Sequence, residues 1–202
     1  MVQLIFRQLI IEVSNEPAYT CGSADNPMRY EREYRLDDGE YAPSSRHAVR
    51  VLSNDGDSEL ANCILAASHG ATGVHDHTAL VHDDSLILAV GPFMVSLNLP
   101  TLDLHWKTQT DDVTCFGVYH SEKHRCYISH GELDVARVSY AGAIEWSHSG
   151  ADIFTNGFVV TDDNVEAIDW NNVAYAWDIG TGRIVRVTPS KTLNPIGNKP
   201  TS

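Results

Sequence analysis

The chain has 202 residues, of which 43% are hydrophobic, and a formal net charge of −13 at pH 7. This length and composition allow a buried core without disulfides or a structural metal. The negative charge repels phosphates, so it disfavours nucleic acid and anionic lipid as partners and favours a basic protein. The same acidity can also serve solubility alone.

Residues 1–76 are predicted to form an N-terminal β-rich segment. Alternation with a period of two dominates, and helical periodicity is scarce. Strands are predicted at 3–13, 28–36, 48–53 and 61–67. A loop containing Pro, Gly and Ser joins the first two strands, and the last two resemble a hairpin around residues 54–57.

Residues 77–188 contain three repeats of about 40 residues, the length of one four-stranded propeller blade. A shift of 40 places Trp106 on Trp146 and Gly117 on Gly157. In the last repeat, residues 162–164 are predicted to close a hairpin, because Asn and Asp tolerate the backbone of tight turns. Residues 189–202 are predicted to be a polar tail.

The last repeat resembles blades of the PQQ-like (quinoprotein) β-propeller superfamily, which carry the pattern Ala-x-Asp-x-x-Thr-Gly-x-x-x-Trp. It keeps the pattern except for the tryptophan, which is replaced by Arg186; the matching residues are Ala176, Asp178, Thr181 and Gly182. The resemblance covers about half of the chain. It implies a short, non-enzymatic member without a cofactor, because the chain is too short for a full ring around a quinone and no quinone-site residues can be carried over.

The two earlier repeats keep the tryptophan, as Trp106 and Trp146, but each departs from the pattern at other positions. Val138 and Ala141 replace the Asp and Thr of the middle repeat, and Leu102 replaces the Gly of the first. The resemblance implies that each tryptophan packs on the neighbouring blade. Arg186 therefore indicates a terminal blade, since end units of repeat arrays are atypical.

Three repeats are too few to close a propeller. The first 76 residues either complete a small, irregular ring, or the blades form an open arc whose edges are covered by the N-terminal strands or by a second subunit. The predicted fold class is accordingly all-β, a small or incomplete β-propeller of four-stranded antiparallel blades. A homo-oligomer is expected if the array is open.

A histidine-rich stretch gives a candidate metal site at His75, His77 and His82. A His-x-His pair beside another imidazole can bind zinc or another transition metal. The spacing resembles part of a cupin metal motif but lacks its glycine register and later Glu. The alternative interpretation places His82 at a hairpin turn and the other two at the entry to a strand.

Predicted turns at the propeller rim give candidate partner-binding residues, because partners bind there. These residues are His130, Glu132, Asp162 and Asp163. A second group, His120, Glu122 and His124, is interpreted as a solvated turn.

No nucleophile elbow, phosphate-binding loop or dinucleotide motif is present, so no enzyme is predicted. None of the four cysteines forms a C-x-x-C pair, and they are expected to be free. The start of the chain lacks a signal-peptide pattern, and no apolar run is long enough to span a membrane. The chain is therefore expected to be soluble and cytoplasmic.

The sequence favours a non-catalytic protein-interaction module, with an acidic inhibitor of the immunity type, bound to a basic protein, as its concrete form. Two alternatives stay open. One is a metal-binding protein or metal-dependent enzyme that uses the His75 and His77 region. The other is a module for sugars or small ligands that uses exposed aromatic residues such as Trp170 and Trp177.

Overall fold

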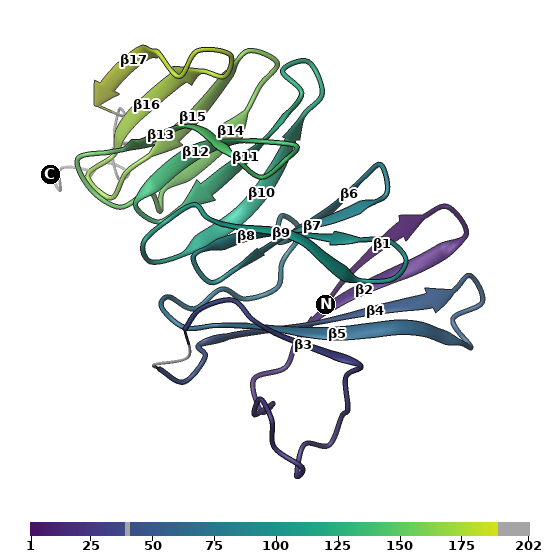
Figure 1. Cartoon of the computed structure of the whole chain (residues 1–202). Coiled ribbons are helices and arrows are strands. Elements are labelled where there is room, and N and C mark those ends of the chain that lie inside the picture. Colours follow the sequence, from purple (N-terminus) through teal and green to yellow (C-terminus); the bar gives the residue numbers. More distant parts are fainter. Residues whose placement is uncertain (39–40, 190–202) are drawn as a thin grey trace, which may run out of the picture.

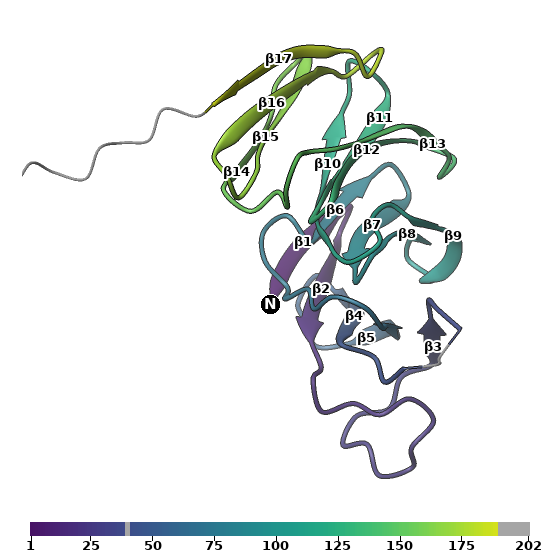
Figure 2. The same cartoon turned by 90° about the vertical axis from the view of Figure 1, so that its left-hand side faces the viewer.

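A computed structural model describes residues 1–38 and 41–189, and these residues form four separate β-sheets in a row (Figure 1). Among them there is no helix of the length and apolar character needed to cross a membrane. The N-terminal sheet and the last sheet lie at opposite ends of the row in two perpendicular views (Figure 2). The array is therefore an open arc.

The N-terminal sheet has five strands in the order β1-β2-β4-β5-β3. They are β1 (Val2–Phe6), β2 (Leu9–Asn15), β3 (Arg32–Arg35), β4 (Ser45–Ser53) and β5 (Glu59–Ala67). β3 pairs with β5 in parallel, and the other pairs are antiparallel. The prediction of one strand over 3–13 is wrong, because the chain turns back at Arg7, which adopts a left-handed conformation with φ 55°.

Three blades follow, each with four antiparallel strands in sequence order. The first blade contains β6 (Ala79–His82), β7 (Ser85–Val90), β8 (Phe93–Asn98) and β9 (Asp103–Gln109). The second contains β10 (Cys115–Ser121), β11 (Cys126–Gly131), β12 (Asp134–Ser139) and β13 (Ile144–Ser149). The third contains β14 (Gly157–Val160), β15 (Asn164–Ile168), β16 (Val173–Asp178) and β17 (Ile184–Pro189).

The predicted fold class is confirmed: the chain is an all-β, incomplete propeller of four-stranded antiparallel blades. The division of the chain into domains stays a prediction. The expected polar tail, except for Pro189, lies outside the described residues. All four cysteines are free, and burial raises the pKa of Cys63 to about 12 and that of Cys115 to about 11.

Each pair of neighbouring sheets encloses its own hydrophobic core. Leu86 and Leu88 on one face of β7 pack against the N-terminal sheet, and Ile87 on the other face packs against the second blade. This follows from the period of two, which sends alternate side chains of a strand to opposite faces. The second and third blades share a further core around Phe154 and Trp177.

Tryptophans join successive blades in the way that the superfamily resemblance implies. The Trp106 Nε1 donates to the Tyr140 carbonyl at 3.1 Å, and the Trp146 Nε1 donates to the Ile179 carbonyl at 3.0 Å. Each ring covers a turn glycine with positive φ: a Cβ on Gly142 would lie 2.6 Å from the Trp106 ring, and one on Gly182 would lie 2.7 Å from the Trp146 ring. Glycine is needed at both turns for conformation and for space.

The first blade has Leu102 where the other two have this glycine. Leu102 still adopts a left-handed conformation, with φ 60°, and its side chain is buried in the core shared with the N-terminal sheet. The Tyr34 hydroxyl donates to the Leu102 carbonyl at 2.9 Å. A tyrosine of the N-terminal sheet thus contacts the first blade much as the tryptophans contact the later blades.

The last blade has one face on which no other sheet of the described residues packs. Glu166, Ala176 and Arg186 lie side by side on this face through the registers of β15, β16 and β17. The Arg186 Nη2 and the Glu166 Oε2 form an ion pair at 2.7 Å. A polar outer face is typical of a terminal unit in a repeat array.

The outer face of the N-terminal sheet is covered differently, by the loop between β2 and β3. Tyr19 of this loop is buried against Ala48 and Ile64, and its ring meets that of Tyr30 edge-on at 5.2 Å. The Tyr19 hydroxyl donates to Glu33. A segment of the chain itself therefore occupies the place that another blade would take.

Candidate functional site

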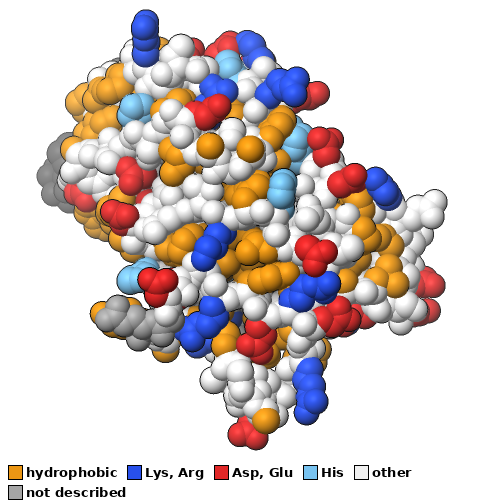
Figure 3. Space-filling model, viewed as in Figure 1, with side chains coloured by type: hydrophobic (Ala, Val, Ile, Leu, Met, Phe, Trp, Pro, Cys, Tyr) orange, Lys and Arg blue, Asp and Glu red, His pale blue; other side chains and the backbone are white. Residues whose placement is uncertain are grey.

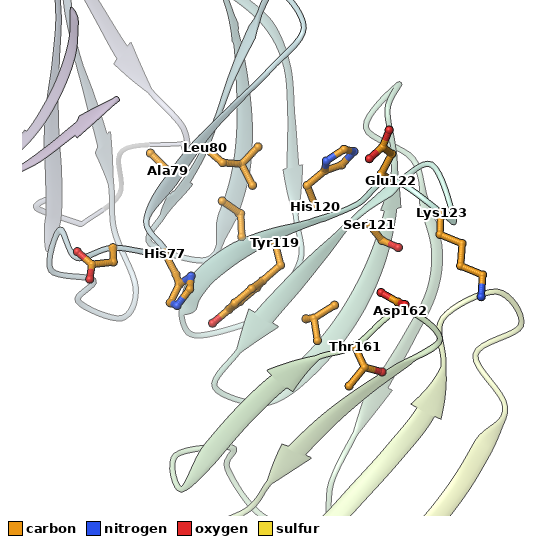
Figure 4. Close-up of a pocket in the computed structure, with 13 residues that line it drawn as sticks. His77, Ala79, Leu80, Tyr119, His120, Ser121, Glu122, Lys123, Thr161 and Asp162 are labelled. Atoms are coloured by element: carbon orange, nitrogen blue, oxygen red, sulfur yellow. The ribbon is translucent and has the colours of Figure 1, made fainter. Parts of the chain in front are cut away.

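A hollow lies along the inner strands β6, β10 and β14 (Figure 4). Each of these is the first strand of its blade, so one backbone edge of each has no strand partner within the described residues. The groove has a volume of about 700 Å³. It occupies the side of the arc that a closed propeller would turn toward its central channel.

The walls of the groove combine apolar and aromatic side chains. Leu80 comes from β6, Tyr119 from the middle of β10 and Val160 from the end of β14. The imidazole of His77 stacks on the Tyr119 ring with centroids 4.6 Å apart, as Figure 4 shows. Tyr119 also lies next to Phe158, with ring centroids 4.9 Å apart. Burial raises the pKa of Tyr119, so its hydroxyl stays protonated at neutral pH.

The rim of the groove is acidic. Asp76 precedes β6, Glu122 lies in the turn after β10, and Asp162 lies in the turn after β14. All three are exposed, and none forms an ion pair with another described residue. Exposed carboxylates that form no ion pair attract a basic ligand, most strongly at low salt.

A lysine at the same rim does not neutralise this charge. The Lys123 Nζ bonds to the Asp163 Oδ1, so the charge of Lys123 is already matched. This hydrogen bond lowers the pKa of Asp163. The rim therefore keeps the charge of its three unpaired carboxylates.

Two histidines and two tyrosines form a hydrogen-bonded cluster between the first and second blades, beside the groove. The His82 Nδ1 and the Tyr127 hydroxyl lie 2.8 Å apart, as do the His120 Nε2 and the Tyr140 hydroxyl. The centroids of the two imidazole rings lie 4.1 Å apart. Burial and the proximity of His82 lower the pKa of His120, so a neutral ring is favoured there.

The three candidate metal ligands do not form one group. The His75 and His77 rings lie 6.4 Å apart, and the His75 Nε2 contacts the Phe116 carbonyl at 2.8 Å. His82 instead contacts Tyr127 and His120. Over residues 1–38 and 41–189, no set of three His, Cys, Asp or Glu side chains is placed to hold a metal ion. Metal binding stays a prediction.

The four candidate partner-binding residues fall into two places. Asp162 and Asp163 share the turn between β14 and β15 at the groove rim. His130 lies near the end of β11 that is far from the groove rim, and its ring stacks on Phe158 with centroids 4.1 Å apart. Burial lowers the pKa of His130 to about 4, and the nearby His75 and His77 contribute to this shift. Glu132 is partly buried in the turn that follows, where its amide donates to the Thr114 carbonyl at 2.8 Å.

Sequence reasoning missed Glu122 and Tyr119 as parts of the groove. The shift of 40 does place Glu122 on Asp162, so Glu122 was lost because its turn was interpreted as solvated and not because the repeat was misaligned. A signal was present nevertheless: every turn after an inner strand carries acidic residues, namely Asp83, Asp84, Glu122, Asp162 and Asp163.

No family model matches the chain, and no curated protein matches it either. Among solved structures the chain is similar to BamB from Moraxella catarrhalis, with a TM-score of 0.53, 14% identity and coverage of 92% of this chain and 63% of BamB. It is also similar to the computationally designed protein Ika8, with a TM-score of 0.54, 9% identity and coverage of 93% and 61%.

A third similar structure is the dihydro-heme d1 dehydrogenase NirN, with a TM-score of 0.55, 9% identity and coverage of 71% of this chain and 33% of NirN. At these identities the likeness shows the β-propeller fold alone. The chain spans about three fifths of BamB and Ika8 and a third of NirN, in keeping with an incomplete ring.

Proposed function

We propose that this chain is a non-catalytic protein-interaction module that binds a basic partner protein, in the concrete form of an acidic inhibitor of the immunity type. The single observation that supports this most is the open groove with its unpaired carboxylates at Asp76, Glu122 and Asp162. The net charge of −13 acts in the same direction over a longer range, because it steers a basic protein toward the surface.

The experiment is an affinity capture from lysate of the native host at low salt, followed by a salt step and mass spectrometry. We expect a stoichiometric basic protein in the eluate, because screening by salt weakens association between opposite charges. Release that does not respond to salt, or an eluate without a basic protein, would contradict the proposal.

The inhibitor form has its own test. The captured partner is expressed in a bacterial host alone and together with this chain. We expect growth arrest in the first case and normal growth in the second. A partner that is harmless alone would leave the interaction module in place and remove the immunity-type function.

A further inference from the structure

We propose that the groove receives an extended segment of the partner, with Lys or Arg at alternate positions, which adds as a strand along the open edge of β14. This inference rests on the proposed function and gives it a location and a chemical form. It combines three independent features of the groove: an unpaired strand edge, an aromatic wall and an acidic rim.

The backbone is the first feature. An unpaired strand edge offers a row of N–H and C=O groups that an extended peptide can use. Part of the β10 edge is already occupied, since the Val118 amide donates to the His77 carbonyl at 2.9 Å. The edge of β14 (Gly157–Val160) borders the same groove through Val160 and the turn residues Thr161 and Asp162. It is therefore the edge to which we assign the added strand.

Side-chain spacing is the second feature. In an extended segment every second side chain points the same way, about 7 Å apart along the chain. One such row would meet the carboxylates of Glu122 and Asp162, which rise from neighbouring turns at the same end of the groove (Figure 4). Further along the groove, Asp76 adds a carboxylate beside the stacked rings of His77 and Tyr119. Alternating cations thus match the charges on both parts of the groove.

Three other parts of the described surface lack this combination of features. The free face of the last blade pairs its own charges, Glu166 with Arg186. The outer face of the N-terminal sheet is covered by its own loop around Tyr19. Exposed apolar side chains gather on β17, orange at the upper left of Figure 3, at Ile184, Val185 and Val187, but they carry no charge that would select a basic partner.

The test measures binding of a fluorescein-labelled (Arg-Thr)4 peptide by anisotropy, with the full chain at low salt, and of (Glu-Thr)4 as the opposite charge. The variant Glu122→Gln/Asp162→Asn removes two charges from the rim. Its matched control, Asp25→Asn/Asp57→Asn, removes two exposed charges from the N-terminal sheet and its loop, away from the groove. All four residues are exposed, so both variants are expected to unfold at the wild-type temperature.

We expect the rim variant to raise the Kd for (Arg-Thr)4 at least fivefold and the control to change it less than twofold. Equal effects would mean attraction to overall charge and would overturn the groove assignment. No binding of (Arg-Thr)4 to the wild type, or equal binding of (Glu-Thr)4, would overturn it as well. A dimer in sedimentation experiments that is lost in the rim variant would assign the groove to a second copy instead.

Strand pairing has a separate readout. An (Arg-Thr)4 peptide N-methylated at alternate residues keeps its charge but loses half of its amide donors. We expect at least tenfold weaker binding, and unchanged binding would overturn the added strand. If the lysate partner is captured equally by the wild type and the rim variant, the proposed function stands and this inference falls. If no partner is captured from lysate but the peptide results hold, the groove assignment stands and the proposed function falls.

Discussion

The interface between the second and third blades can be compared with the free outer face of the third blade. The comparison shows how the array continues and how it ends. On the second blade, Trp146 covers Gly182 of the next blade and donates to Ile179. One repeat later, Arg186 stands where the tryptophan would be and pairs with Glu166. The backbone of the two blades is alike, so the array ends through a change of side chains at an equivalent position.

The first sheet ends the array by another route. Its outer face keeps apolar residues such as Ile64, and a loop of the same chain covers them with Tyr19. One end is therefore made polar and the other is covered. This comparison predicts that substitutions on the packed face cost far more stability than substitutions on the free face.

The largest effect is expected for Trp146→Ala. The substitution removes the ring over Gly182 and leaves the Ile179 carbonyl without its donor, so the free energy of unfolding should fall by about 3–4 kcal/mol. Urea denaturation at pH 7 measures it. The matched control is Trp170→Ala, whose ring is 62% exposed and should cost less than about 0.5 kcal/mol. Equal losses would refute the docking role of Trp146.

Acid should weaken the same packed interface at His130. Because burial lowers the pKa of His130 to about 4, the folded protein keeps this ring neutral where the unfolded chain would protonate it. The contribution of the neutral ring to the free energy of unfolding is complete above pH 6.5 and is lost as the pH falls toward 4. The loss amounts to at most about 3 kcal/mol. Over this range the wild type should lose stability relative to His130→Phe in denaturation curves, since the variant lacks the titrating group. Parallel pH profiles would contradict the prediction.

A smaller effect is expected when the free face is given the missing docking ring. Arg186→Trp breaks the pair with Glu166 and exposes an aromatic ring beside Ala176. We expect stability to change by less than about 1 kcal/mol but larger species to form, because an exposed aromatic ring promotes association. Sedimentation velocity over a concentration series measures this. Unchanged sedimentation would show that the polar pair is not what ends the array.

The smallest effect is expected for Arg186→Ala. The pair with Glu166 is exposed and screened by water, so its loss should cost less than about 0.5 kcal/mol. The comparison with Trp146→Ala at the equivalent position of the second blade is made in one set of urea curves. A loss above 2 kcal/mol would mean that the free face contributes to stability as a packed face does.

The blades were the most predictable part of the fold, because their turns carry residues with a strong local preference. The hairpin at Asp162, Asp163 and Asn164 is an example. The N-terminal sheet was less predictable. Its first turn places Arg7 in a left-handed conformation, and the turn contains no glycine or asparagine that would have predicted it. The parallel pairing of β3 with β5 depends on contacts between residues far apart in the chain.

The candidate site was predictable only in part, for a related reason. Asp162 was found because its turn follows the repeat closely. Tyr119 and Glu122 line the groove only because strands of neighbouring blades meet there, and these blades come together only after the sheets pack. The arrangement of His82 with Tyr127, 45 positions later, is equally a product of packing between blades.

The open arc has a mechanical consequence. In a closed ring, the last blade is held against the first, and every interface angle is fixed by closure. Here the N-terminal sheet and the last blade are free ends joined through three interfaces, so small rotations at each interface add together. Such rotations would change the width of the inner channel, and they are opposed by the core of each interface and by the bonds of Trp106, Trp146 and Tyr34 across it.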